Sequence, residues 1–154
     1  MISIVLYQPQ IPPNTGNIMR LCFNTGSTLH IIKPTGFSLD EKSLKRARMD
    51  YFTNTKPIIH ESFESFMSEK REKNIYAVTK FGKSIYSKVN FSNNIYLLFG
   101  SETKGLPAYI IKMLKYNSIK IPMMDHSRSL NLSNSVSIVV YEVWKQLKFS
   151  GAKL

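Results

Sequence analysis

Short apolar runs rich in Ile, Val and Tyr alternate along the chain with segments whose apolar residues recur every three to four positions. The first pattern is typical of buried strands and the second of amphipathic helices. We expect strands at residues 2–7, 28–32, 58–60, 75–79, 95–99 and 118–121. We expect helices at residues 14–24, 40–48, 62–70 and 131–148, and a short helix that Pro107 opens. Asp40 and Ser62 are the expected N-caps, and Gly26 is the expected C-cap of the first helix.

This regular alternation of strand and helix predicts an α/β fold with a mainly parallel sheet flanked by helices. No repeat, low-complexity tract or linker divides the chain, so we expect one domain over residues 1–154. In such a sheet, ligands bind beyond the carboxyl ends of the strands. The polar loops that follow the strands are therefore the first places to look for chemistry.

The charge of the chain favours a polyanionic partner. Twenty-one Lys and Arg residues against ten Asp and Glu residues give a formal net charge of +11 and a pI near 9.8. Seven lysines lie between residues 80 and 120, where Glu102 is the one acid. Such a distribution promotes nucleic-acid binding by counterion release, although surplus lysine can also serve solubility alone.

Several classes of site are disfavoured by what the sequence lacks. Cys22 is the single cysteine and no Cys/His cluster has metal-ligand spacing, so we expect no disulfide and no metal. No 18-residue apolar window is present, which predicts a protein of the cytoplasm without a membrane partner. The G-x-G motif of dinucleotide sites is also absent. His30, His60 and His126 have no nearby nucleophile and are expected to pack in the core or lie on the surface.

Three polar loops remain as candidates for a site. They read PQIPPNTGNIMR at residues 9–20, FGSETKGLP at residues 99–107 and IPMMDHSRSLNLSNSV at residues 121–136. Prolines stiffen the first loop, glycines allow close approach of a ligand to the second, and hydroxyl and amide groups crowd the third. Each loop taken singly is also compatible with a turn followed by a helix N-cap.

Together, in this order, the loops and the strands before them resemble the SPOUT methyltransferases, in particular the small tRNA wobble-nucleotide 2′-O-methyltransferases. The likeness extends over nearly the whole chain and rests on the motifs IVLY at 4–7, PPNTGNI at 12–18, RLC at 20–22, LHII at 29–32, the 99–107 loop and SRSLNLSN at 127–134. The resemblance implies a SPOUT-type knotted fold with a C-terminal trefoil knot within about residues 75–150, an exception to the rule that chains are unknotted.

The resemblance also implies S-adenosylmethionine as methyl donor and assigns the site residues. The positions that match the family's donor site are Val78, Gly100, Ile121, Ser129 and Leu130. The positions that match its catalytic or substrate-positioning residues are Arg20, Asn14, Glu102 and Asn131. We expect Arg20 to project into the site, hold a nucleotide phosphate and stabilise the developing alkoxide, with Glu102 orienting it. The group that accepts the hydroxyl proton stays open.

Two kinds of partner follow from the same resemblance. The family forms homodimers, and the apolar last helix with the exposed side of the first helix is the expected interface. The substrate is expected to be tRNA, lying across the lysines of residues 80–120. The same fold could instead methylate another tRNA or rRNA nucleotide, or serve as a non-catalytic basic RNA-binding protein, although the latter would be expected to lose the polar residues of the three loops.

Overall fold

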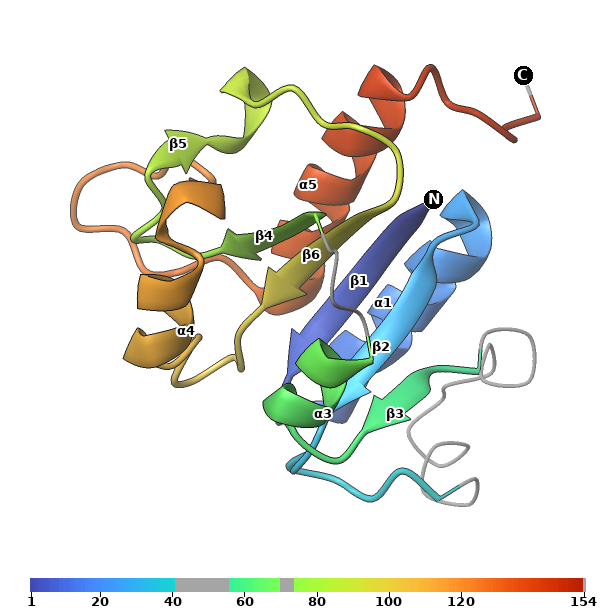
Figure 1. The fold of residues 1–154 in the computed structure, drawn as a ribbon, viewed down its shortest axis with the longest axis vertical. Helices are drawn as coiled ribbons and strands as arrows, with labels where there is room; N and C mark the ends of the chain where they lie inside the picture. Colours follow the sequence, from blue (N-terminus) through green and yellow to red (C-terminus); the bar gives the residue numbers. More distant parts are fainter. Residues whose placement is uncertain (41–55, 70–73, 154) are drawn as a thin grey trace.

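The computed structural model describes residues 1–40, 56–69 and 74–153, and it is an α/β fold (Figure 1). The strands are β1 Ile2–Tyr7, β2 Thr28–Ile32, β3 Ile58–His60, β4 Asn74–Val78, β5 Ser84–Ile85, β6 Ile95–Phe99 and β7 Ser118–Lys120. The helices are α1 Pro12–Thr25, α3 Phe63–Ser68, α4 Ala108–Met113 and α5 Leu132–Gln146, with short 3₁₀ helices at Tyr86–Lys88 and Lys115–Asn117. The strands form one sheet in the order β3-β2-β1-β6-β4-β7-β5, and every pairing between these strands is parallel.

The predicted strands are confirmed to within one residue at each end, and the α/β class with a parallel sheet is confirmed. α1 begins two residues earlier than predicted, at Pro12, because proline is well suited to the first positions of a helix. Gly26 adopts a left-handed φ of 66° at the C-cap, as expected. Pro107 is the N-cap of α4 and stands just before its first turn. The helix expected at residues 40–48 falls on residues 41–48, outside the described ranges.

β5 is the one described strand that the sequence analysis did not predict. β5 has only two residues and no apolar run of its own; its extended conformation comes from pairing with β7, where Ser84 and Ile85 lie opposite Ile119 and Lys120. Ser62 caps α3 as predicted, since its Oγ accepts a hydrogen bond of 3.0 Å from the Ser65 N–H.

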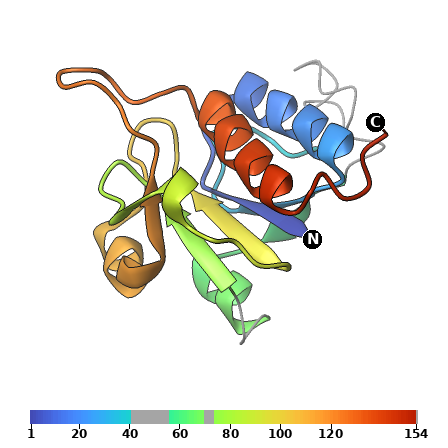
Figure 2. The same cartoon turned by 90° about the horizontal axis from the view of Figure 1, so that it is seen from above.

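Two helical layers cover the sheet. α1 and α5 lie side by side on one face, and α3 and α4 lie on the other (Figure 2). Because strand side chains alternate between faces, Ile4 and Leu6 of β1 pack in the cluster with α1 and α5, whereas Val5 packs in the cluster with α3 and α4. Both faces of β1 are therefore buried, as its continuous apolar run requires.

The apolar stripe of α5 is buried within the chain. Val136, Val139, Val140 and Val143 are all 0% exposed, because the helix packs on the sheet and against α1 together. These valines face the core of their own chain, so they offer no surface to a second copy, and the homodimer stays a prediction. The large apolar residues that α1 and α5 do expose are Phe23 and Tyr141, 50% and 46% accessible.

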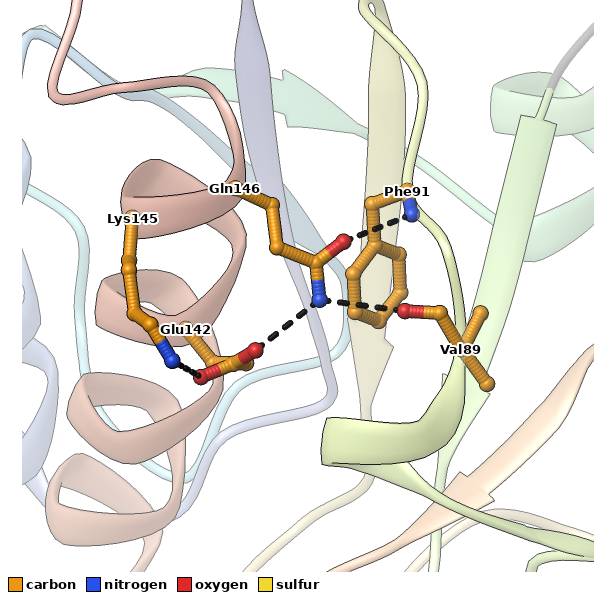
Figure 3. Close-up of polar contacts among 5 residues, drawn as sticks. All are labelled: Val89, Phe91, Glu142, Lys145 and Gln146. Atoms are coloured by element: carbon orange, nitrogen blue, oxygen red, sulfur yellow. Dashed lines mark hydrogen bonds and ion pairs between the residues drawn. The ribbon is translucent and has the colours of Figure 1, made fainter.

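Hydrogen bonds of the Gln146 side chain connect the C-terminal part of α5 to the segment before β6 (Figure 3). The Gln146 amide donates to the Val89 carbonyl at 3.0 Å and to Glu142 Oε1 at 2.9 Å, while its oxygen accepts from the Phe91 N–H at 2.9 Å. Glu142 also pairs with Lys145 at 3.4 Å. One side chain thus satisfies two backbone groups that no strand partner reaches. Among the described residues, no helix combines the length and hydropathy needed to cross a bilayer.

Candidate active site

The three polar loops meet at the carboxyl ends of neighbouring strands. β1, β6, β4 and β7 are four consecutive strands of the sheet, and the loops that follow them gather at one end of these strands (Figure 2). They surround an open cavity of about 370 Å³. This volume lies in the range of small-molecule sites, and the location is the one expected for a parallel sheet.

Eight of the nine predicted site residues line this cavity. They are Asn14, Val78, Gly100, Glu102, Ile121, Ser129, Leu130 and Asn131. They come from α1, the end of β4 and the loops that follow β6 and β7, so folding assembles them from four separate parts of the sequence. Their assembly supports the assignment of one site, while their individual roles stay predictions.

A chain of hydrogen bonds joins the three loops. The Asn14 Nδ2 amide donates to Glu102 Oε1 at 3.0 Å, and the Asn131 Nδ2 amide donates to Asn14 Oδ1 at 2.9 Å. Asn14 is buried, with 6% of its surface accessible, and both ends of its carboxamide are engaged. Burial with partners on both sides fixes the rotamer of Asn14 and the orientation of its amide.

Glu102 also holds the start of α1. Its carboxylate accepts hydrogen bonds from the backbone N–H groups of Gln10, at 2.8 Å, and Ile11, at 3.1 Å. Ile11 is the N-cap residue and its side chain cannot cap the helix. A carboxylate from a distant loop therefore accepts from the two N–H groups that precede the helix, and it places a negative charge near the positive end of the helix dipole. The predicted role of Glu102 in orienting Arg20 stays a prediction.

Asn131 has a second structural task at the start of α5. Its Oδ1 accepts from the Ser133 N–H at 2.9 Å, from Ser133 Oγ at 2.7 Å and from the Asn134 N–H at 3.3 Å. It is the N-cap of α5, as the residue type favours. One asparagine thus caps α5 with its oxygen and reaches Asn14 with its nitrogen.

Gly100 allows the second loop to turn back sharply. A Cβ at this position would stand 2.1 Å from the Gly105 carbonyl carbon, which no side chain tolerates. The turn is closed by the Gly105 N–H, which donates to the Ser101 carbonyl at 2.9 Å. Glycine is therefore required here by the closeness of two backbone segments, and the closed turn positions Glu102.

Arg20 is the one predicted site residue outside the cavity lining of the described residues. It lies on the exposed stripe of α1 that also carries Pro13, Asn17 and Asn24. It follows Asn14 by six residues, which is about 9 Å along a helix axis. The role predicted for Arg20 stays a prediction.

Comparison with known proteins identifies the fold. Residues 1–141 match the SpoU rRNA Methylase family. The chain belongs to this family. Over 155 residues it is 50% identical to the tRNA (cytidine(34)-2′-O)-methyltransferase of Escherichia coli strain K12, with 100% of this chain and 99% of that protein covered. It is 51% identical over 160 residues to the protein of the same name from Yersinia pestis, with 100% and 99% covered.

Solved structures agree with this membership. A protein solved in work on "the 2-OH methylation of C/U34 on tRNA" is 38% identical, with a TM-score of 0.88 over 96% of this chain and 97% of that chain. The SpoU methyltransferase AviRb from Streptomyces viridochromogenes, solved with the cofactor AdoMet, is 22% identical and has a TM-score of 0.80 over 95% of this chain and 60% of that chain. The similarity to AviRb, at 22% identity, shows the fold alone. The resemblance to SPOUT methyltransferases is thereby confirmed.

Sequence reasoning missed part of the cavity of this SpoU methylase. Thr79, Lys80 and Phe81 also line it, directly after β4. The rule that selected the other loops, a polar segment after a parallel strand, applies equally to this one. Its lysines were interpreted only as charge, and Phe81 was overlooked because a single aromatic residue in a loop gives no periodic signal.

Two of the histidines form a buried pair away from the cavity. His30 Nδ1 lies 3.0 Å from His60 Nε2, and both rings pack against Phe66. Of the two places expected for the histidines, core or surface, these two lie in the core. His126 lies exposed in the third loop. No group of three or more His, Cys, Asp or Glu side chains that could hold a metal occurs in the described part of the chain.

Proposed function

We propose that this protein transfers the methyl group of S-adenosylmethionine to the ribose 2′-hydroxyl of the wobble nucleotide of tRNA, a cytidine or a modified uridine. The observation that carries the proposal is the cavity at the carboxyl ends of the strands, where Glu102, Asn14 and Asn131 join three loops. It occurs in a chain that is 50% identical, over its full length, to proteins named tRNA (cytidine(34)-2′-O)-methyltransferase.

The cavity fits the proposed methyl donor. Its volume of about 370 Å³ suits a nucleoside-sized ligand, and its wall combines the apolar side chains of Val78, Ile121 and Leu130 with the polar Ser129. Gly100 also lines the cavity, where its backbone groups can contact the donor. When bound, S-adenosylmethionine supplies a sulfonium-activated methyl group. A complex of AviRb with AdoMet exists on the same fold, which supports the choice of donor.

The residues of the chain position the acceptor ribose. Asn14 is held from both sides, so its remaining donor and acceptor capacity is preorganised toward the cavity. Asn131 and Ser129 close the cavity from the third loop. Holding a hydroxyl at the correct distance and angle supplies a large part of the acceleration in such displacements. Glu102 contributes by fixing the loop and helix that carry Asn14.

Arg20 is proposed to bind the nucleotide phosphate and to stabilise the alkoxide that develops on the ribose. A guanidinium stays protonated and grips two oxygens with its planar fork, which a lysine cannot do. We expect Arg20→Ala to lower single-turnover methyl transfer by about two to three decades, the usual cost of such a contact, with donor affinity unchanged. Arg20→Lys should restore little. Lys145→Ala, which removes an exposed cation from α5, is the matched control.

Near-normal transfer by Arg20→Ala would remove the residue from the mechanism. Near-normal transfer by Arg20→Lys alone would reduce it to a general cation. Because Arg20 lies on the outer surface of α1, its contact with RNA requires the substrate to extend from the cavity along that helix or a second protomer to carry the residue there.

The proposal includes a trefoil knot. β7 lies between β4 and β5 in the sheet, although β5 follows β4 in the sequence. The 79–83 loop must therefore cross β7, and its backbone is bonded to it: the Thr79 N–H donates to the Ile119 carbonyl and the Lys83 N–H to the Ser118 carbonyl, both at 3.0 Å. A strand that passes under an earlier loop and continues into α5 is the arrangement from which such a knot is built.

A homodimer and a cytoplasmic location complete the proposal. The support for a dimer is the exposed pair of aromatic residues, Phe23 and Tyr141, on the outer face of α1 and α5. Light scattering of the purified protein tests the stoichiometry. A monomeric mass with full activity would refute the dimer and leave the proposed reaction intact.

The decisive experiment maps ribose methylation. RNA from cells with and without the protein is compared, and the purified protein is given S-adenosylmethionine and tRNA. Loss of 2′-O-methylation at the wobble nucleotide, restored in vitro, supports the proposal. A changed site in rRNA or elsewhere in tRNA would redirect it to another nucleotide, and no change anywhere with RNA binding intact would indicate a non-catalytic RNA-binding protein.

A further inference from the structure

Two exposed aromatic rings beside the cavity each carry a lysine over the ring. Lys80 Nζ lies 5.1 Å from the centroid of Phe81, and Lys83 Nζ lies 4.7 Å from the centroid of Tyr116. Phe81 is 69% accessible and Tyr116 is 80% accessible, so most of each ring is in contact with water. An exposed aromatic ring offers a flat apolar face on which another ring can stack.

The loop that carries Phe81 and both lysines has a backbone packed closely against β7. This 79–83 loop includes Gly82, where a Cβ would stand 2.2 Å from the Ile119 carbonyl carbon. The Lys83 N–H also donates to Ser118 Oγ at 3.1 Å. The backbone of the loop is thus held against β7, so Phe81 and both lysines extend from a fixed stretch of backbone. Tyr116 lies on the 3₁₀ helix Lys115–Asn117, which leads directly into β7.

The position of Phe81 ties these pairs to the reaction. Lys80 and Phe81 line the same cavity as Asn14 and Glu102, whereas Tyr116 does not. A group that lies on Phe81 is therefore next to the reacting centre. A group on Tyr116 is one step farther along the surface, beside Lys83.

The charge around the rings selects the kind of partner. The sequence between residues 80 and 120 contains seven lysines and one acidic residue, Glu102. The Glu102 carboxylate already accepts hydrogen bonds from two backbone N–H groups and from Asn14. Lys80 and Lys83, which lie over the rings, would repel a basic partner at this surface, and the second copy is proposed at the outer face of α1 and α5 instead. A ligand that presents flat apolar groups together with negative charges fits the surface at the rings, and a single-stranded nucleic acid has both.

We propose that Phe81 and Tyr116 are stacking platforms for unpaired bases of the RNA substrate, with Lys80 and Lys83 contacting the adjoining phosphates. Phe81 receives the base of the methylated nucleotide or of an immediate neighbour, and Tyr116 receives a base farther along the loop. The inference rests on the proposed function and deepens it. In a duplex the base faces are hidden by stacking, so the platforms explain how a chain of this size selects a nucleotide in a single-stranded loop.

The test is a double-mutant cycle between protein and RNA. Phe81→Ala, Phe81→Leu and Phe81→Trp are combined with anticodon stem-loops that carry a single abasic site at successive loop positions. Affinity is measured by fluorescence anisotropy. Loss of a stacked base weakens binding by about fivefold to a hundredfold. We expect Phe81→Ala and Phe81→Leu to show this loss, Phe81→Trp to retain affinity, and one abasic position to abolish the difference between wild type and Phe81→Ala.

Matched controls separate stacking from other roles. Met124→Ala removes an apolar side chain that is 85% exposed on the neighbouring loop and lies outside the cavity lining, and it should leave RNA affinity unchanged. Tyr116→Ala should couple to a different abasic position from Phe81→Ala. Donor affinity by calorimetry and mass by light scattering should be the same for wild type and all variants.

Four outcomes would overturn the inference. Additive effects at every abasic position would exclude stacking, and so would full affinity in Phe81→Leu. A fall in donor affinity with RNA affinity unchanged would make Phe81 a wall of the donor site, and a changed mass would make it a protein contact. These failures differ from failure of the proposed function, in which the wild-type protein itself would neither bind nor methylate the anticodon stem-loop.

Discussion

Replacing Glu102 with glutamine tests whether one carboxylate holds the candidate site together. The substitution keeps the shape of the side chain but turns one of its two oxygens into an NH₂ group. Oε2 accepts from the Gln10 N–H at 2.8 Å, and Oε1 accepts from the Ile11 N–H and from Asn14 Nδ2. Whichever oxygen is replaced, at least one hydrogen bond is lost and a donor then faces a donor.

The expected cost follows from these contacts. A hydrogen bond to a charged group contributes about 1.5 to 3 kcal/mol, and Glu102 is only half-buried, so the lower end applies. Losing the negative charge at the start of α1 costs about 0.3 to 1 kcal/mol more. We expect Glu102→Gln to lower the free energy of unfolding by about 2 to 3 kcal/mol, or the melting temperature by about 5 to 10 °C. Glu102→Ala, which removes all three bonds, should cost more.

Urea unfolding of both variants measures the effect, and single-turnover methyl transfer shows whether the released Asn14 also slows the reaction. Glu61→Gln is the control, since the Glu61 side chain is 79% exposed in a surface pair with Lys33 and should change stability by less than about 1 kcal/mol. Stability of Glu102→Gln equal to that of Glu61→Gln would refute the argument that Glu102 anchors the two loops.

Three further predictions concern Asn131, Gln146 and Cys22. Asn131→Asp keeps the oxygen that caps α5 but loses the amide that donates to Asn14. The free energy of unfolding, measured by thermal denaturation, should therefore change by less than about 1 kcal/mol, while the rate of single-turnover methyl transfer falls. If Asn131→Asp lowered stability and transfer rate as much as Asn131→Ala does, the capping role and the contact with Asn14 would not be separable. Gln146→Ala leaves the Phe91 N–H and Val89 carbonyl without their side-chain partner and should cost about 1 to 3 kcal/mol in urea unfolding, against almost nothing for Lys145→Ala. Burial raises the pKa of the Cys22 thiol from 9.0 to about 12, so iodoacetamide should label it at pH 8 only in denaturant. Because the proton is held more tightly in the folded state, this group's stabilisation is complete below pH 9 and is lost as the pH rises toward 12; rapid labelling of the native protein would show that the thiol is open to solvent.

Local patterns in the sequence were sufficient to predict most of the strands and helices and to select the loops that form the candidate site. A continuous apolar run predicts a buried strand such as Ile95–Phe99, and an apolar stripe after an N-cap asparagine predicts a helix such as α5. Both signals can be detected because they involve residues that are close in the sequence. The polar loops after the strands could be selected in advance because parallel strands end at a common edge. The family motifs then assigned residues within those loops, and eight of the nine line one cavity.

Contacts between distant residues could only be decided by the tertiary structure. Glu102 lies 88 residues from Asn14 and Asn131 lies 117 residues from it, and these bonds exist because β6 pairs beside β1 and the third loop returns to α1. Periodicity carries no information about strand order, which is chosen by the burial of whole faces. For the same reason the sequence could not show that α1 and the sheet together cover the valines of α5, that Arg20 lies outside the cavity lining, or that Ser84 and Ile85 form a strand by pairing with β7.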